Sequence, residues 1–216
     1  MYEFISGPLM WVSFIIFLGG SLLNLGFFLR LARKDRVVFP HMGFKYFPLS
    51  LWTWVLNFFR TNFMKRPNVT IATVIFHICL LVSPIFFYSH VVLWYQTWNT
   101  SWWALPDKVA DGMTAFVIII CFFFLLRRLL LKEVKCVTAF SDYVFLALVA
   151  APFITGFVTF HQWFAYEPML ILHILSGQIL LIVLPFSRLS HMLFIFFTQA
   201  YMGSEFEAVH IAKNQK

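Results

Sequence analysis

The chain has 216 residues, of which 61% are hydrophobic and 20% aromatic, and only 12% are charged. A soluble domain carries about twice this share of charged residues, so the composition excludes an ordinary soluble enzyme and indicates a membrane protein. The formal net charge of +7 does not indicate nucleic-acid binding, because the basic residues stand at the ends of apolar segments.

Five apolar segments are long enough to cross a bilayer, for which a helix needs about 20 residues. They cover, approximately, residues 9–30, 69–97, 110–131, 142–165 and 169–200. We therefore expect an all-α membrane protein, a five-helix transmembrane bundle that forms one integral-membrane domain over residues 1–216. Between the first two spans, residues 49–64 combine Trp, Phe and Leu with a basic end, which is typical of an amphipathic helix at the membrane interface.

The distribution of lysine and arginine predicts the orientation of these spans. Eight basic residues follow the first span and four follow the third, whereas the loops on the opposite side contain only Lys108. Basic loops stay in the cytoplasm. We therefore expect the N-terminus outside and the C-terminus in the cytoplasm.

Four histidines within the spans are the first candidates for a functional site, because ionisable side chains are costly in a membrane. His173 and His191 are 18 residues apart, which on one helix is five turns and about 27 Å. Spans two and five run in opposite directions. His77 and His191 are therefore expected near the cytoplasmic side (the inner pair), and His90 and His173 near the outer side (the outer pair).

Each pair could hold one haem iron between two neutral imidazoles, which suits electron transfer because no iron position stays open for a substrate. The alternative for any single histidine is a bond to a neighbouring carbonyl with no metal. The fourth ligand is the open question. His77 and His90 are 13 residues apart, a rotation of about 220° on an ideal helix, although Pro84 between them could kink or rewind it. His161, at the outer end of span four, is the rival outer ligand.

Other residues of the fifth span suit the same site. Arg188 lies one turn before His191 and could pair with haem propionates, or reach phospholipid headgroups. Gly177 lies one turn after His173, where the missing side chain would let a flat macrocycle approach the backbone, or let two helices pack closely. Pro185 is expected to kink the helix.

The run from His173 through Pro185-Phe186-Ser187-Arg188-Leu189 to His191 resembles the last helix of the respiratory nitrate reductase gamma subunit, a five-helix dihaem cytochrome b. Two more stretches agree with that family: Phe76-His77-Ile78, and Leu126-Arg127-Arg128-Leu129 through Ser141-Asp142-Tyr143. The resemblance implies haem b ligation at His77, His173 and His191. In that family the second histidine of span two comes ten residues after the first, where this chain has Phe87. His90 is therefore the nearest candidate for the fourth ligand.

The basic and aromatic segment before span two is similar to that of cytochrome b subunits found with heterodisulfide-reductase-like iron–sulfur proteins in the transmembrane redox complexes of sulfate reducers and related anaerobes. This resemblance implies two haem b groups, with menaquinone as a further candidate, in a prokaryotic inner membrane. The implied partners are a cytoplasmic heterodisulfide-reductase-like or ferredoxin-like iron–sulfur subunit, other membrane subunits and a periplasmic multihaem cytochrome c.

The expected function is electron transfer across the membrane, as a subunit of an oxidoreductase in an anaerobic respiratory complex. The electrons would pass between a periplasmic donor or the quinone pool and the cytoplasmic iron–sulfur partner. One alternative is a subunit that oxidises quinol at the outer haem, with Lys108 as the candidate basic residue. Another is a haem-free membrane anchor or transporter whose histidines relay protons.

Overall fold

The computed structural model describes residues 2–34, 52, 55–56, 60, 63–195 and 198. Within these ranges the chain is helical and contains no β-strand. Five described stretches are long and apolar enough to cross a membrane: Tyr2–Leu31, Pro67–Phe86, Asp107–Leu130, Phe140–Phe160 and Tyr166–Val183. The expected all-α, multi-pass membrane class is thereby confirmed. The interfacial helix expected over residues 49–64 lies largely outside the described residues.

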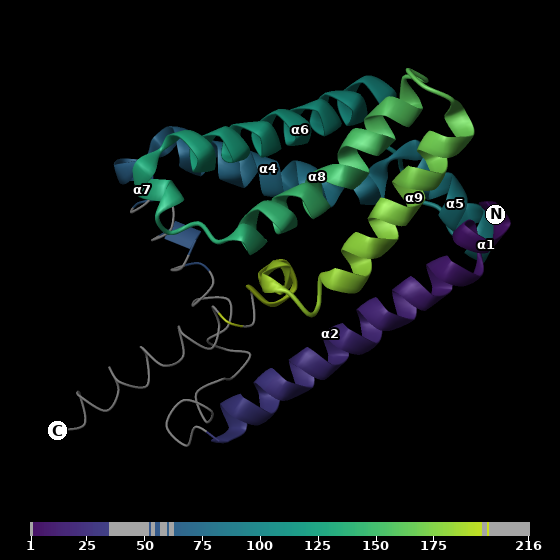
Figure 1. Ribbon diagram of the computed structural model, residues 1–216. Coiled ribbons are helices and arrows are strands. Elements are labelled where there is room, and N and C mark those ends of the chain that lie inside the picture. The colour runs from purple at the N-terminus through teal and green to yellow at the C-terminus, as the bar shows by residue number, and fades with distance from the viewer. Residues whose placement is uncertain are drawn as a thin grey trace. The chain divides into compact units, whose positions relative to one another are not determined.

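The helices follow one another along the chain as Figure 1 labels them. They are α1 (Tyr2–Ser6), α2 (Pro8–Lys34), α4 (Pro67–Phe86), α5 (Tyr88–Trp98), α6 (Asp107–Leu130), α7 (Lys132–Lys135), α8 (Phe140–Phe160), α9 (Tyr166–Val183) and a 3₁₀ helix η2 (Arg188–Ser190). Residues 191–195 after η2 are again helical.

The chain divides into two compact units. The first comprises residues 1–8 and 71–180, and so contains α5, α6 and α8 with most of α4 and α9. The second contains most of α2, the start of α4 and the described residues after 180. The predicted outer pair lies within the first unit, whereas His77 belongs to the first unit and His191 to the second.

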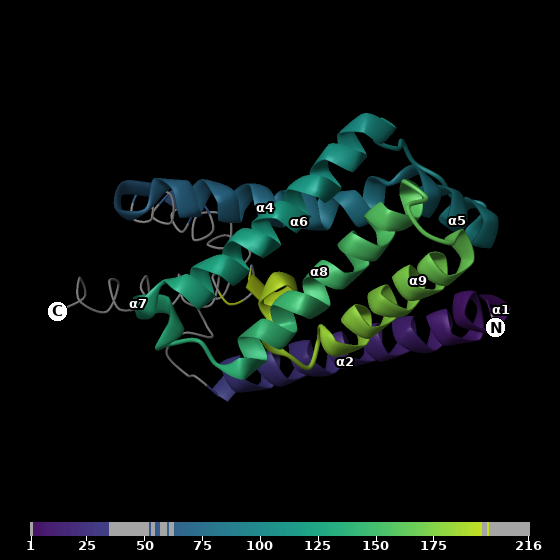
Figure 2. The same ribbon diagram turned by 45° about the horizontal axis from the view of Figure 1, so that its top comes forward.

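In the first unit, α6 and α8 pack side by side, as both views show (Figures 1 and 2). Small side chains are buried on these helices, among them Val117 and Cys121 of α6 and Ala150 of α8. Large apolar side chains of α6 are exposed, Ile119 by 63% and Phe122 by 59%. Such exposure would be costly in water over a whole helix, but it is the ordinary state of a helix surrounded by lipid.

The second span is not one continuous helix. Phe87 has φ −68° and ψ 131°, an extended conformation, and it separates α4 from α5. Pro84 lies inside α4, one turn before the break. Because the helix is broken, the rotation of about 220° calculated for an ideal helix does not decide which way His90 faces.

The fifth span is interrupted as well. Helix α9 ends at Val183, and Pro185 follows at a buried position. A proline lacks the amide hydrogen that the next helical bond would need. The sequence predicts a kink at Pro185. In the structure the helix does not bend there but ends before the proline. His173 and His191 do not share one unbroken helix, so the spacing of about 27 Å between them does not apply.

Candidate functional site

His90 lies in the first turn of α5, directly after the break at Phe87. A helix uses each carbonyl to accept from the amide four residues further on, and the extended residue Phe87 interrupts this pattern. The carbonyl of Pro84 instead accepts a hydrogen bond of 2.7 Å from Nδ1 of His90. A carbonyl can only accept, so Nδ1 of His90 carries a proton, and in the neutral ring Nε2 then carries none.

The two carbonyls after Pro84 receive donors from the loop between α5 and α6. The indole nitrogen of Trp102 donates to the carbonyl of Ile85 at 3.0 Å, and the amide of Leu105 donates to the carbonyl of Phe86 at 2.9 Å. In lipid, a carbonyl without a donor is costly. These two bonds therefore stabilise the break that leaves the Pro84 carbonyl available for His90.

His173 lies on α9 and faces α8. Its Nδ1 donates a hydrogen bond of 2.9 Å to the carbonyl of Pro152. Gly156 is one helical turn after Pro152 on α8, and a Cβ atom at Gly156 would lie 2.9 Å from Cε1 and 3.0 Å from Nδ1 of the His173 ring. The glycine therefore leaves the space that the ring occupies.

The structure brings the two histidines of the predicted outer pair together. The ring centres of His90 and His173 are 6.0 Å apart, and their planes are inclined by only 14°. Both rings have Nδ1 bound to a main-chain carbonyl of a proline. Two neutral imidazoles held in this way can offer their Nε2 lone pairs to a metal ion.

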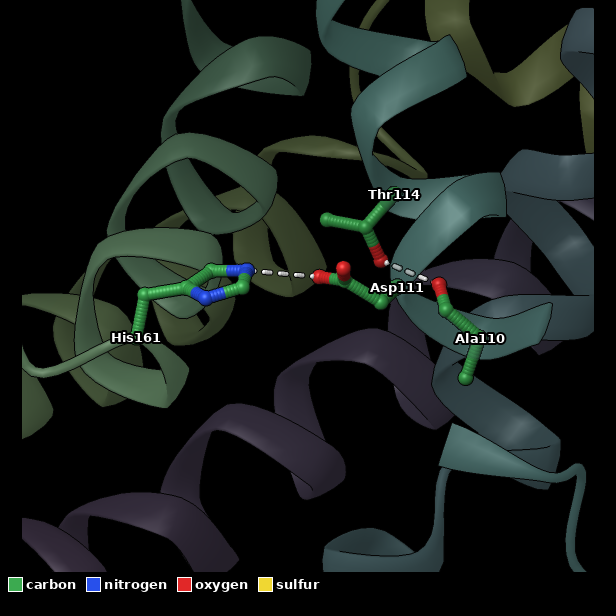
Figure 3. A network of polar contacts seen from close by, with 4 residues as sticks. All are labelled: Ala110, Asp111, Thr114 and His161. Atoms are coloured by element: carbon green, nitrogen blue, oxygen red, sulfur yellow. Dashed lines mark hydrogen bonds and ion pairs between the residues drawn. The ribbon is translucent and has the colours of Figure 1, made fainter. Parts of the chain in front are cut away.

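His161, the rival ligand, is engaged differently. It follows the last residue of α8, and its Nε2 lies 2.9 Å from Oδ1 of Asp111 on α6 (Figure 3). Each side chain of this pair is 31% exposed. Thr114, also drawn in Figure 3, bonds within α6, to the carbonyl of Ala110 at 2.9 Å. One ring nitrogen of His161 is thus bound to a carboxylate.

His77, the inner candidate of the first unit, lies in the middle of α4 and is partly buried. Its Nδ1 donates to the carbonyl of Thr73 at 2.7 Å. The ring of Phe76 meets the ring of His77 edge-on at 5.4 Å. The backbone contact fixes the same tautomer as in the outer pair.

In the second unit, His191 directly follows η2, and its Nδ1 donates to the carbonyl of Arg188 at 2.7 Å. Arg188 and His191 are both exposed within the described residues. The turn before η2 is held by α2: Nδ2 of Asn24 donates to the carbonyl of Pro185. A Cβ atom at Gly20 of α2 would lie 2.6 Å from Cζ of Phe186. A polar group and a glycine of α2 thus support the turn that leads to His191.

The pairing of His77 with His191 joins residues of different units, and it stays a prediction. Gly177 lies on α9, where a Cβ atom would meet nothing within 4 Å among the described residues. There is room at this glycine for a group outside the chain.

No protein-family model matches the chain. The chain is 35% identical over 211 residues to a protein of Nitratidesulfovibrio vulgaris strain Hildenborough. The alignment covers 95% of this chain and 93% of that protein. The chain belongs to the family of this protein. Because nearly all of both sequences is aligned, the family likeness is not confined to one helix or one motif.

The structure shows residues that support the candidate histidines of this chain and that sequence reasoning missed. Chief among them are Gly156, Trp102 and Asn24. An asparagine inside a membrane span is a usable signal, because its amide must find a partner there. The glycine and the tryptophan carry no such signal, since both are ordinary residues of membrane helices and interfaces.

Proposed function

We propose that the chain is a membrane-bound dihaem cytochrome b subunit that carries electrons across a prokaryotic inner membrane. The electrons would pass between a periplasmic donor or the quinone pool and a cytoplasmic iron–sulfur partner of an anaerobic respiratory complex. The observation that carries this proposal is the outer pair: two imidazoles on separate helices, 6.0 Å apart and nearly parallel.

The separation of the two ring centres is the size expected for two imidazoles on a single metal ion. Two metal–imidazole bonds of about 2 Å each, pointing in opposite directions, leave the ring centres roughly 6 Å apart. The observed separation of His90 and His173 is 6.0 Å. A direct hydrogen bond between the rings would need a proton on one Nε2, and each ring has its proton on Nδ1.

All four proposed ligands have the same kind of partner at Nδ1. His77, His90, His173 and His191 each donate from this nitrogen to a main-chain carbonyl, at 2.7, 2.7, 2.9 and 2.7 Å. Metal-bound histidines characteristically donate their other ring nitrogen to a carbonyl or carboxylate, which fixes the tautomer and raises the basicity of the ligand. His161 differs, because its Nε2 is bound to Asp111, which would leave Nδ1 for a metal ion, and the ring that lies beside His173 is that of His90. The contacts therefore favour His90 over His161 as the fourth ligand.

A haem held by two histidines supplies reversible one-electron transfer and leaves no iron position open to substrate. The chain's own residues would fix the ligand orientation and surround the site with apolar side chains. Arg188, one turn before His191, is placed to bind haem propionates, and Gly177 leaves room beside the helix that carries His173. Both assignments belong to the proposal.

The test is a redox-titrated absorption spectrum of the purified, full-length protein, produced in cells supplied with haem. Two b-type haems are expected, and His191→Ala and His173→Ala should each remove one of them. The matched control is His161→Ala, which should keep both. A protein that shows no haem after such preparation would refute the cytochrome and favour the haem-free anchor or transporter.

A second function, quinol oxidation at the outer haem, is favoured by the pair of His161 and Asp111. The ring of His161 is connected to that of His90 by successive ring contacts through Phe160 and Phe87, with centres 5.3, 6.0 and 5.9 Å apart. Oxidation of a quinol releases two electrons and two protons, so it needs a proton acceptor beside the electron acceptor. A histidine oriented by a carboxylate is a suitable acceptor.

This second function is tested by reducing the purified protein with a menaquinol analogue. Asp111→Ala should slow haem reduction by the quinol and leave reduction by dithionite unchanged. Lys108→Ala serves as the comparison, because Lys108 is the basic residue that the sequence suggests for the same role. Equal quinol reduction in the Asp111→Ala protein would argue for direct transfer from a cytochrome c instead.

A further inference from the structure

The His173 ring packs against Gly156 of α8 so closely that a side chain at this position would overlap with it. A Cβ atom there would stand 2.9 Å from Cε1, 3.0 Å from Nδ1 and 3.7 Å from Nε2. The first two distances are well below the usual contact of about 3.5–4.0 Å between nonbonded carbon atoms. No residue other than glycine can therefore occupy position 156 unless the His173 ring moves.

The ring has little freedom to move, because the same helix also holds it through Nδ1. Pro152 and Gly156 are four residues apart on α8, so they lie on the same face of the helix. The Pro152 carbonyl accepts from Nδ1 of His173 at 2.9 Å. One face of α8 thus supplies both the acceptor for the ring and the space for it.

A further contact joins α9 to α8 near this face. The hydroxyls of Thr155 on α8 and Ser176 on α9 are 3.3 Å apart. The Ser176 hydroxyl also donates to the main-chain carbonyl of His173 at 2.8 Å. Because the Thr155–Ser176 contact joins α9 to α8 one turn after His173, we expect a group added at Gly156 to displace the ring before it displaces the helix.

We propose that Gly156 is a positioning residue for the outer haem, an inference that rests on the proposed function. By lacking a side chain, it lets the imidazole of His173 stay bonded to the Pro152 carbonyl with Nε2 available to the iron. The glycine thereby sets the orientation and the basicity of one axial ligand, and through them the reduction potential of the outer haem.

The expected effect of a methyl group at position 156 follows from this geometry. The ring would turn or withdraw, and the bond from Nδ1 to the Pro152 carbonyl would lengthen or break. A less basic ligand stabilises ferric iron less, so the outer haem's potential should rise. Changes in such supporting contacts typically cost about 10- to 100-fold in metal affinity, so the outer haem should also be lost more readily.

The experiment compares Gly156→Ala with Gly112→Ala in the full-length protein, isolated from membranes. Gly112 of α6 is a matched control, because a Cβ atom there meets nothing within 4 Å among the described residues. Two quantities are measured for each haem: its midpoint potential, and its low-temperature electron paramagnetic resonance signal, which reports the relative orientation of the two ligand planes. The His173→Ala and His191→Ala proteins identify which signals belong to the outer and which to the inner haem.

Support would be a raised potential and an altered or diminished resonance of the outer haem in the Gly156→Ala protein, with the inner haem and the Gly112→Ala protein unchanged. Two unchanged haems would overturn the proposal. Loss of both haems together with the folded chain would also overturn it, since the glycine would then serve helix packing in general. Absence of haem from the unaltered protein is a separate outcome, and it refutes the proposed function itself.

Discussion

The imidazole rings of His90 and His173 lie 6.0 Å apart, centre to centre, with planes inclined by 14°. The two histidines come from α5 and α9, and each is oriented by a proline carbonyl, that of Pro84 or that of Pro152. Pro84 precedes a helix break, whereas Pro152 lies inside α8. The arrangement is thus made by the main chain of α4 and α8, and the two rings depend on these helices for their direction.

The first prediction concerns the choice between His90 and His161 as the outer ligand. His90→Ala should remove the outer haem, because no other imidazole in the first unit has Nδ1 bonded to a carbonyl beside His173. His161→Ala should leave both haems in place, because its Nε2 contacts Asp111. The measurement is the haem content per chain, by pyridine haemochrome absorbance. The opposite pattern, one haem lost with His161→Ala and none with His90→Ala, would reverse the ligand assignment.

A second prediction tests the helix break that orients His90. Trp102→Phe keeps an aromatic ring and removes the indole donor to the Ile85 carbonyl. Loss of one such bond should cost about 1 kcal/mol of unfolding free energy. The outer haem should dissociate faster, because the Pro84 carbonyl is less firmly held for His90. The rate is measured as haem transfer to apomyoglobin.

Trp103→Phe is the control for this change. The ring of Trp103 stacks on Phe86 with centres 4.5 Å apart, and phenylalanine preserves that kind of contact. Its haem-transfer rate should match the unaltered protein. If both variants release haem at the same rate as the unaltered chain, the indole bond does not matter to the site.

Features that depend on the length and apolarity of a segment could be predicted from the sequence. Features that depend on contacts between distant residues could not. Five spans were predictable because a run of about 20 apolar residues has few other uses. The direction of His90 could not be predicted, because an ideal helix turns it away from His77. The break at Phe87 that changes this direction depends on donors from Trp102 and Leu105, further along the chain.

The same limit applies to the fifth span and to Gly156. Pro185 signals an interruption, but a proline alone does not say whether a helix bends or ends. A glycine in an apolar helix does not reveal what it faces, and only the position of the His173 ring gives Gly156 its meaning. The likeness in ligand spacing could therefore identify candidate histidines without identifying the residues that orient them.

A third prediction concerns the turn before His191. Asn24→Leu removes the donor to the Pro185 carbonyl while keeping the volume of the side chain similar. A partly buried carbonyl left without a donor should cost about 1–3 kcal/mol in unfolding free energy, measured by denaturant titration in detergent micelles. Because the Pro185 turn leads into η2, the inner haem should be lost before the outer one.

Ser21→Ala is the matched change on the same helix, since among the described residues the Ser21 hydroxyl bonds within α2, to the Phe17 carbonyl at 2.6 Å. This variant should unfold at nearly the same denaturant concentration as the unaltered protein. Equal stability of the Asn24→Leu and Ser21→Ala proteins would show that α2 does not support the turn.

The last prediction tests the orientation in the membrane. Cys136 is exposed directly after α7, whereas Cys79 and Cys121 are buried. By the positive-inside rule, the basic residues at the end of α6 and in α7 predict that this loop lies in the cytoplasm. A membrane-impermeant maleimide should therefore label Cys136 in inverted vesicles and not in intact spheroplasts, while Cys136→Ser should abolish the labelling. Labelling in intact spheroplasts would show the opposite topology. His90 and His173 would then lie on the cytoplasmic side.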